Sequence, residues 1–232
     1  GLLGCAASPS TGDDQATAAT PSTTVAVPST ATAVPSTATA VPSSATAEVS
    51  PASRTTADRR VPAVSPAAAA QGFVDVRTVV PDARVELAYA TADNFTGQRL
   101  YPANARCLVH ESLAPGLRTA AAALRGQGLT LVFWDCYRPH SVQQQMFEVV
   151  PDPEWVARPG PYSTSHESGR SVDVTLARGK RLLDMGTGFD DFSARAHARA
   201  TAGVSARAQA NRTLLREAMA AGGLTVYSSE WW

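Results

Sequence analysis

Two side chains able to bind a metal ion stand seven positions apart in this sequence. His166 falls in a serine-rich segment, and Asp173 falls on the polar side of the alternating stretch Ser171–Leu176. A catalytic zinc ion takes three protein ligands from His, Asp, Glu or Cys and keeps a further position open for water. An aspartate among β-branched residues is costly to bury unless it is paired or binds a metal. The same spacing also fits an ordinary buried hydrogen bond between the two side chains.

Two further charged residues follow stretches that have the character of strands. Arg138 comes after Leu129–Trp134 and immediately before Pro139, and Glu230 stands between small and aromatic residues after the stretch 224–228. A fixed cation can stabilise negative charge that develops during a reaction, and a carboxylate can take a proton from water. The simpler interpretation makes Arg138 one half of a surface ion pair and Glu230 a solvated residue near the chain end.

The segments that must position these residues are short strands mixed with helices. Ser112 and Ser205 can cap helices that end before Gly126 and Gly222, because a serine hydroxyl satisfies a free backbone N–H group and glycine suits the helix C-terminus. We expect strands at 73–76, 85–88, 129–134, 171–176 and 224–228, and helices at 112–125, 140–150 and 205–221. Since strands and helices do not alternate regularly, the sequence predicts an α+β fold with a mostly antiparallel central sheet flanked by helices.

Five separated motifs resemble those of the D-Ala-D-Ala dipeptidase family of zinc peptidases, in the same order along the chain. They are residues 89–97 (YATADNFTG), 137–139 (YRP), 166–173 (HESGRSVD), 185–190 (MGTGFD) and 230–232 (EWW). The resemblance covers residues 73 to 232. It implies the fold of that family and a zinc-dependent hydrolysis of the dipeptide D-Ala-D-Ala, a reaction linked to cell-wall peptidoglycan metabolism.

The resemblance also implies roles for the charged residues. His166 and Asp173 resemble the first two zinc ligands, and Glu230 resembles the catalytic base that takes a proton from the zinc-bound water. Arg138 resembles the residue that steadies the negative charge on the scissile carbonyl oxygen. These roles agree with the general chemistry of zinc hydrolases, in which the metal lowers the pKa of its water and a fixed cation stabilises the oxyanion.

Three more positions match substrate-binding residues of the family. Tyr89 and Asp190 resemble the groups that hold the free ammonium of the dipeptide, which restricts the family to short substrates. Thr164 stands where the family usually has serine, so the hydroxyl is kept. The same chemistry suits a zinc D,D-carboxypeptidase acting on peptidoglycan stem peptides, but Tyr89 and Asp190 would collide with a longer stem.

The third zinc ligand of the family is a histidine that would directly follow Trp232, where this sequence ends. We therefore expect a dipeptidase domain at 71–232 that is truncated at its C-terminus and binds zinc weakly in this form. The histidines at 110, 140 and 197 are expected to be structural or at the surface rather than substitute ligands. A wall-binding lipoprotein without catalysis is a further alternative.

The N-terminal part has the composition of a tether. Residues 6–70 are almost wholly Ala, Ser, Thr, Pro and Val, with a seven-residue repeat that carries one proline in each unit. Proline prevents a continuous helix, and the scattered small apolar residues cannot repay the entropy of folding. Residues 1–5 resemble the remnant of a bacterial lipobox ending at Cys5. They predict an extracytoplasmic lipoprotein anchored to the membrane by a lipid on Cys5, although a chance leucine pair is the alternative.

The charge balance limits the classes of binding partner, and the cysteine content allows one disulfide. The 232-residue chain has twenty basic and twenty acidic residues, so no basic field exists to attract nucleic acid. No apolar run approaches the ~20 residues that span a bilayer. The expected partners are a small dipeptide and, through the lipid, a membrane. In an oxidising compartment Cys107 and Cys136 can form a disulfide, and two separate buried thiols are the alternative.

Overall fold

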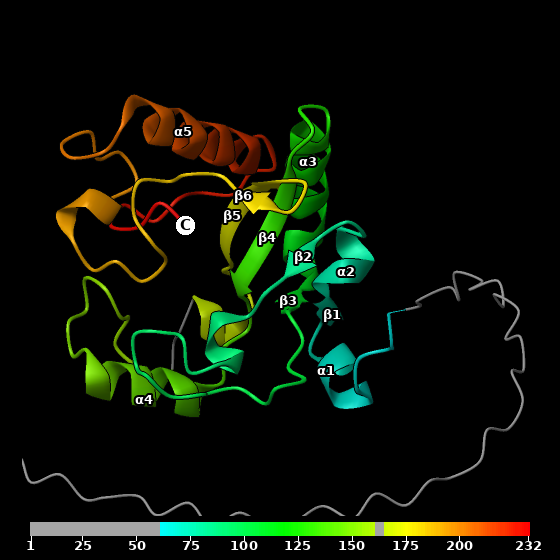
Figure 1. Ribbon diagram of the computed structural model, residues 1–232. Coiled ribbons are helices and arrows are strands. Elements are labelled where there is room, and N and C mark those ends of the chain that lie inside the picture. The colour runs from blue at the N-terminus through cyan, green and yellow to red at the C-terminus, as the bar shows by residue number, and fades with distance from the viewer. Residues whose placement is uncertain (1–60, 161–164) are drawn as a thin grey trace, which may run out of the picture. The chain divides into compact units, whose positions relative to one another are not determined.

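The computed structural model describes residues 61–160 and 165–232 (Figure 1). The predictions for Cys5, for the tether as far as residue 60, and for Thr164 lie outside the described residues. Within the described part, no helix combines the length and the apolar character that crossing a bilayer requires.

The central sheet has four strands in the order β2-β4-β5-β6. Strand β4 (Thr130–Asp135) pairs with β5 (Asp173–Arg178) in antiparallel orientation, and β5 pairs with β6 (Arg181–Leu182) in the same way. Strand β2 (Arg84–Val85) runs parallel to β4. The α+β prediction is confirmed, and the sheet is mixed because its β2 edge is parallel.

A second, two-stranded sheet pairs β1 (Phe73–Asp75) with β3 (Leu108–His110) in antiparallel orientation. It connects directly to the central sheet, because Tyr137 N–H, just after β4, donates to the Leu108 carbonyl at 2.9 Å. Asp75 ends β1 and caps the short helix α2 (Val76–Val79) by accepting a hydrogen bond from Arg77 N–H.

The folded part begins earlier than residue 71, where the tether was expected to end. Helix α1 (Pro66–Ala70) is capped by Ser65, whose hydroxyl accepts from Ala68 N–H at 3.2 Å. The Arg106 guanidinium donates to the carbonyl oxygens of Pro62 and Ala63 at 2.5 and 3.1 Å. A short helix rich in alanine is stable here because these contacts hold it against the domain.

Two long helices, α3 (Ala114–Arg125) and α5 (Ala206–Ala221), pack against each other (Figure 1). Gly116 on α3 and Gly222, directly after α5, lie so close that a Cβ atom on either residue would lie within 2.4 Å of the other's carbonyl oxygen. Leu117 on α3 is fully buried. Only glycine allows this approach, because any side chain would separate the two backbones.

The two predicted helix caps had different outcomes. Ser205 caps α5 as predicted, accepting from Ala208 N–H at 3.1 Å. The cap at Ser112 was wrong, because a 3-10 turn, η2 (Glu111–Leu113), precedes α3. There the ring Nδ1 of His110 accepts from Ser112 N–H, so the histidine does the capping.

Helix α4 (His140–Val149) starts directly after Pro139, and the remaining 3-10 turns are η1 (Ala88–Ala90), η3 (His166–Ser168) and η4 (Ala194–Ala196). The strand expected at 224–228 is not formed. This stretch alternates half-buried and exposed side chains as a strand would, but it does not pair with a strand of either sheet. Backbone hydrogen bonds at its two ends hold it instead, from Leu224 N–H to the Met219 carbonyl and from Ala198 N–H to the Ser228 carbonyl.

Candidate active site

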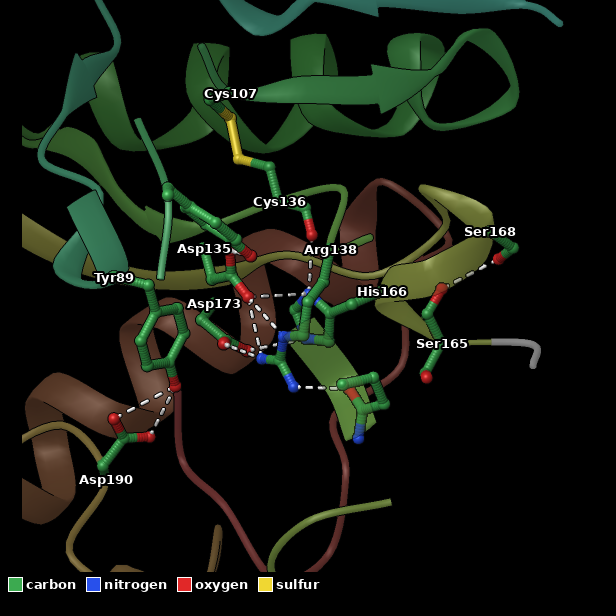
Figure 2. A network of polar contacts seen from close by, with 12 residues as sticks. Tyr89, Cys107, Asp135, Cys136, Arg138, Ser165, His166, Ser168, Asp173 and Asp190 are labelled. Atoms are coloured by element: carbon green, nitrogen blue, oxygen red, sulfur yellow. Dashed lines mark hydrogen bonds and ion pairs between the residues drawn. A yellow bond between two sulfur atoms is a disulfide. The ribbon is translucent and has the colours of Figure 1, made fainter. Parts of the chain in front are cut away.

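One cavity of about 710 Å³ gathers six of the residues that the sequence singled out. They come from separate segments: Tyr89 on η1, Arg138 after β4, His166 on η3, Asp173 at the start of β5, Asp190 in the loop before η4, and Glu230 in the C-terminal segment. Figure 2 shows five of them, Glu230 excepted, around the ends of β4 and β5. The sixth residue, Glu230, lines the wall of the same cavity.

An irregularity in the β4–β5 pairing brings two carboxylates together. Phe133 lies opposite Val174, but the next paired position along β4 is Asp135, which lies opposite Asp173. Trp134 is therefore the extra residue of a bulge. A bulge changes which side chains face which side of the sheet and is often found beside active sites. Here it sets Asp135 and Asp173 side by side at the cavity end of the sheet.

Gly169 allows the tight turn between His166 and Asp173. Its backbone has φ +68°, a left-handed conformation that glycine adopts without strain. A Cβ atom at this position would lie 2.3 Å from a ring carbon of Phe73. The turn is tied to the β4 end as well, because Arg138 N–H donates to the His166 carbonyl at 3.1 Å.

His166 presents one ring nitrogen to Asp173 and is fixed by the other. Its Nδ1 lies 2.8 Å from the Cys136 carbonyl oxygen, and its Nε2 lies 3.2 Å from Asp173 Oδ1. Because a carbonyl only accepts, Nδ1 carries a proton, which leaves Nε2 as the nitrogen that can bind a metal. Burial lowers the pKa of His166, but the negative charge of Asp173 raises it, and the net direction is upward.

Asp135 is also close enough to count as a metal ligand beside His166 and Asp173. Donor atoms of these three residues lie within 4.8 Å of one another. However, Asp135 lies beside the ring nitrogen of His166 that is not free to bind a metal. Its Oδ2 is 3.6 Å from Nδ1, which is hydrogen-bonded to the Cys136 carbonyl. Its oxygens already accept from Arg138 and from the Tyr101 hydroxyl. We therefore assign Asp135 to the support of Arg138.

Arg138 is buried, which excludes the interpretation as a surface ion pair. Only 8% of the residue is exposed. Its Nε and Nη2 lie 2.9 and 2.7 Å from Asp135 Oδ2, and its Nη1 donates to Gln143 Oε1 at 2.8 Å. Burial alone lowers the pKa of the guanidinium, but Asp135 and its other neighbours move the pKa well above its ordinary value. Arg138 is therefore a permanent, rigidly held positive charge in the cavity wall.

A disulfide joins Cys107 and Cys136 directly beside this arginine (Figure 2). Both cysteines are 1% exposed. The bond connects the residue before β3 to the residue after β4. It anchors the backbone whose carbonyl, at Cys136, orients the ring of His166.

Tyr89 and Asp190 contact each other in the cavity wall (Figure 2). The Tyr89 hydroxyl lies 3.1 Å from both carboxylate oxygens of Asp190 and donates to them. Burial, with the negative charge of Asp173 adding to it, raises the pKa of Asp190 to about 7. Burial also moves the pKa of Tyr89 well above its ordinary value, so the hydroxyl stays a donor. Among the described residues, Asp190 is the one non-glycine with positive φ (56°), a strained conformation of the kind found at functional sites.

Glu230 is half-buried rather than a solvated chain end. Burial raises its pKa to about 8, the charge of Asp173 adds to the shift, and His166 opposes it. The neighbouring Trp231 fixes the segment, because its indole N–H donates to Thr187 Oγ1 at 2.7 Å. Its ring also packs against those of Trp134 and Trp232.

The other histidines have partners outside this group. His110 contacts Ser112 and Arg170, His140 lies against Glu167, and His197 Nε2 is 3.4 Å from Glu154. None of the three belongs to a cluster that could hold a metal ion within the described ranges.

Sequence reasoning missed the residues that support Arg138. Asp135 and Gln143 bind its guanidinium, and Tyr101 binds Asp135 with an O–O distance of 2.8 Å. Asp135 left a usable signal, since a carboxylate at the end of an apolar strand needs a partner and an arginine follows three residues later. Gln143 left no such signal, because it is one of three consecutive glutamines on a helix and glutamine is usually exposed there.

Comparisons with known proteins identify the family of the chain. The model of the D-Ala-D-Ala dipeptidase family matches residues 69–232. The chain is 39% identical over 161 residues to a D-alanyl-D-alanine dipeptidase of Escherichia coli, an alignment that covers 69% of this chain and 82% of the relative. It is 32% identical over 182 residues to one of Enterococcus faecium and 33% identical over 181 residues to one of Streptomyces coelicolor, each covering 69% of this chain and 89% of the relative. The chain therefore belongs to the D-Ala-D-Ala dipeptidase family of metallopeptidases.

Proposed function

We propose that this protein is a zinc-dependent dipeptidase that hydrolyses D-Ala-D-Ala in the course of peptidoglycan metabolism. The observation that carries the proposal is the convergence of Arg138, His166, Asp173, Asp190 and Glu230 on one cavity. An imidazole, carboxylates and a fixed cation are the groups that metal-assisted peptide hydrolysis needs. The relatives named D-alanyl-D-alanine dipeptidase support the choice of substrate.

The donor set fits zinc. An imidazole nitrogen and a carboxylate oxygen are common zinc ligands, and His166 and Asp173 would hold the ion. When bound, zinc supplies Lewis acidity, which polarises a carbonyl and brings the pKa of a water molecule towards neutrality. The resemblance assigns the third ligand to the position after Trp232. Trp232 itself lines the cavity, so a residue attached to it would begin at the cavity wall.

The remaining residues divide the work on the substrate. Glu230 would take a proton from the attacking water and return it to the leaving amine. Arg138 would stabilise the negative charge that grows on the scissile carbonyl oxygen, since its guanidinium is already held in the wall by Asp135. Asp190, with Tyr89, would bind the ammonium of the substrate. That ammonium would supply a positive charge beside a carboxylate whose pKa is raised to about 7.

The test measures zinc content and hydrolysis on the same preparations. Glu230→Ala should abolish turnover and keep zinc, because a base is lost and no ligand is. His166→Ala should lose both, and His110→Ala, a histidine outside the site, should lose neither. A chain with a histidine directly after Trp232 should hold zinc more tightly than the 232-residue chain. If His166→Ala keeps stoichiometric zinc and full activity, the proposal is wrong.

A second substrate separates the dipeptidase from a D,D-carboxypeptidase. N-acetylated D-Ala-D-Ala keeps the scissile bond and lacks the ammonium that Asp190 and Tyr89 would bind. We expect its kcat/KM to fall by a factor on the order of 10² or more, because a buried carboxylate is left without its partner. Equal hydrolysis of both compounds would favour the carboxypeptidase.

We also propose that the protein is exported and held at the membrane by a lipid on Cys5. The buried disulfide between Cys107 and Cys136 supports export, since such bonds persist in oxidising compartments. Metabolic labelling with a fatty-acid analogue should mark the wild-type protein and spare Cys5→Ala. Absence of label on the wild-type protein from a bacterial host that processes lipoproteins would refute the anchor.

A further inference from the structure

Gln143 is a buried amide that binds the cavity arginine. It lies on α4 and is 1% exposed. Its Oε1 accepts from Arg138 Nη1 at 2.8 Å, and its Nε2 donates to the Ala157 carbonyl at 2.6 Å. Buried amides are costly unless both ends are bonded, and here both ends are.

The two partners fix the orientation of the amide. A guanidinium only donates and a carbonyl only accepts, so the oxygen of Gln143 must face Arg138 and its nitrogen must face Ala157. On the opposite side, Asp135 binds Nε and Nη2 of the same guanidinium. Arg138 is therefore held at two points, which fixes both the position and the rotation of its planar group.

Ala157 connects this amide to another wall of the cavity. Residues 153–158 follow α4 without helix or strand structure, and all of them line the cavity. Since no strand ladder holds this segment, a side-chain bond to its backbone has a direct effect on its position. Gln143 thus joins the Arg138 guanidinium to a second segment of the cavity wall.

The neutrality of Gln143 matters for the charge of the site. Asp135 already places one negative charge on Arg138, and Asp173 Oδ2 lies 3.7 Å from Nη2. A carboxylate at position 143 would add another negative charge. It would weaken the field that the guanidinium exerts on the scissile carbonyl oxygen of the substrate. It would also set a negative oxygen against the Ala157 carbonyl. A neutral amide keeps Arg138 in place without this loss.

On these grounds we infer that Gln143 is a positioning residue for catalysis, which directs the Arg138 guanidinium at the substrate and ties it to the wall at 153–158. The inference rests on the proposed function. It adds a residue that acts through Arg138 and does not touch the reacting atoms.

The experiment is a double-mutant cycle on hydrolysis of D-Ala-D-Ala by the zinc-loaded protein, with a histidine directly after Trp232 in the parent and in every variant. Gln143→Glu is compared with Gln144→Glu, the same change at the adjacent exposed position, each in the parent and the Arg138→Ala background. We expect Gln143→Glu to lower kcat by a factor on the order of 10 and to change KM by less than about twofold. Gln144→Glu should change neither. In the Arg138→Ala background, Gln143→Glu should have no further effect.

Several outcomes would overturn the inference. They are an unchanged kcat in Gln143→Glu, a loss confined to KM, or a loss of equal size with and without Arg138. Gln143→Leu, which removes both hydrogen bonds, should lower kcat in the same direction, and its thermal midpoint reports any damage to the fold. If the zinc-loaded chain with a histidine after Trp232 does not hydrolyse the dipeptide, or if Arg138→Ala in that chain is as active as its parent, the proposed function itself fails. A slow Arg138→Ala beside a fully active Gln143→Glu refutes the inference alone.

Discussion

At the residue scale, two carboxylates of the cavity, Asp190 and Glu230, form no ion pair within the described ranges. Arg138 is balanced by Asp135, and Asp173 lies against His166. Asp190 receives a hydrogen bond from Tyr89, and within the described ranges no ion pair is formed by its carboxylate. Burial raises its pKa, and the negative charge of Asp173 adds to the shift. The site is thus prepared for a ligand that brings its own positive charge.

The raised pKa of Asp190 predicts how stability of the metal-free protein depends on pH. The ordinary pKa of Asp190 is 3.8, and in the folded protein it is raised to about 7. Between these values the unfolded chain has released the proton while the folded chain keeps it, so stability falls as pH rises and the full loss is reached above about pH 7. Asp190→Asn removes the charge and, because asparagine tolerates the left-handed backbone, keeps the conformation.

We therefore expect Asp190→Asn to raise the free energy of unfolding by a few kcal/mol at pH 8 and by much less at pH 4.5. Urea unfolding at both pH values measures the difference. Asp93→Asn, the same change at an exposed position, serves as the control and should show no such pH dependence. An equal effect of Asp190→Asn at both pH values would mean that burial does not raise the pKa of this carboxylate.

At the element scale, the site depends on loops and strand ends that are tied across the fold. The bulge at Trp134 aligns Asp135 with Asp173, and the 3-10 turn at His166–Ser168 is bonded to the residues after β4. The disulfide between Cys107 and Cys136 closes this region, because it fixes the end of β4 to the start of β3.

Replacing both cysteines by serine should lower the free energy of unfolding by about 3–4 kcal/mol, as expected for a cross-link that closes a loop of this length. The two residues are 29 positions apart. Chemical denaturation of the wild type and of the double variant measures the loss. Thiol titration of the unfolded, unreduced exported protein should find neither Cys107 nor Cys136 free. Two free thiols at these positions would contradict the bond.

The elements that the sequence predicted well are those whose signals are local. Ser205 caps α5 because its hydroxyl and the N–H of Ala208, from which it accepts, are three residues apart. The apolar run Leu129–Trp134 likewise supplies most of the central strand β4. The strand at 224–228 was predicted from its alternation, but pairing depends on a partner strand far away in sequence. The cap at Ser112 failed for a different reason: the competing contact, from Ser112 N–H to His110 Nδ1, is local, but histidine is not among the residues that usually cap helices.

The same distinction applies to the site. His166, Asp173 and Arg138 were predicted from motifs that resemble a known family, and the structure brings them to one cavity. The bulge that pairs Asp135 with Asp173 and the amide of Gln143 could not be predicted. Both depend on how two distant segments are placed in space. A motif therefore identifies the reactive groups, and the fold determines which neighbours orient them.

At the scale of the whole molecule, the folded part extends some ten residues further towards the N-terminus than composition suggested. Residues 61–70 belong by composition to the Ala/Ser/Thr/Pro-rich tether. Their backbone nevertheless contributes to the domain, through α1 and through the carbonyls of Pro62 and Ala63 that bind Arg106. Arg106 also pairs with Asp75, so these contacts reach β1 and α2.

The boundary can be tested with two shortened chains. Removing residues 1–60 should leave the thermal midpoint unchanged within about 1 °C, because the removed composition offers no apolar face for packing. Removing residues 1–70 should lower it by several degrees. That deletion takes away α1, its Ser65 cap and the two acceptors of Arg106. A loss of 1–2 kcal/mol shifts the midpoint of a domain this size by roughly 2–8 °C.

Differential scanning calorimetry measures both chains, with zinc content and dipeptide hydrolysis as controls that the first deletion should not change. Equal midpoints for the two chains would place the boundary back at residue 71, and a large drop in the first would show that the tether packs on the domain.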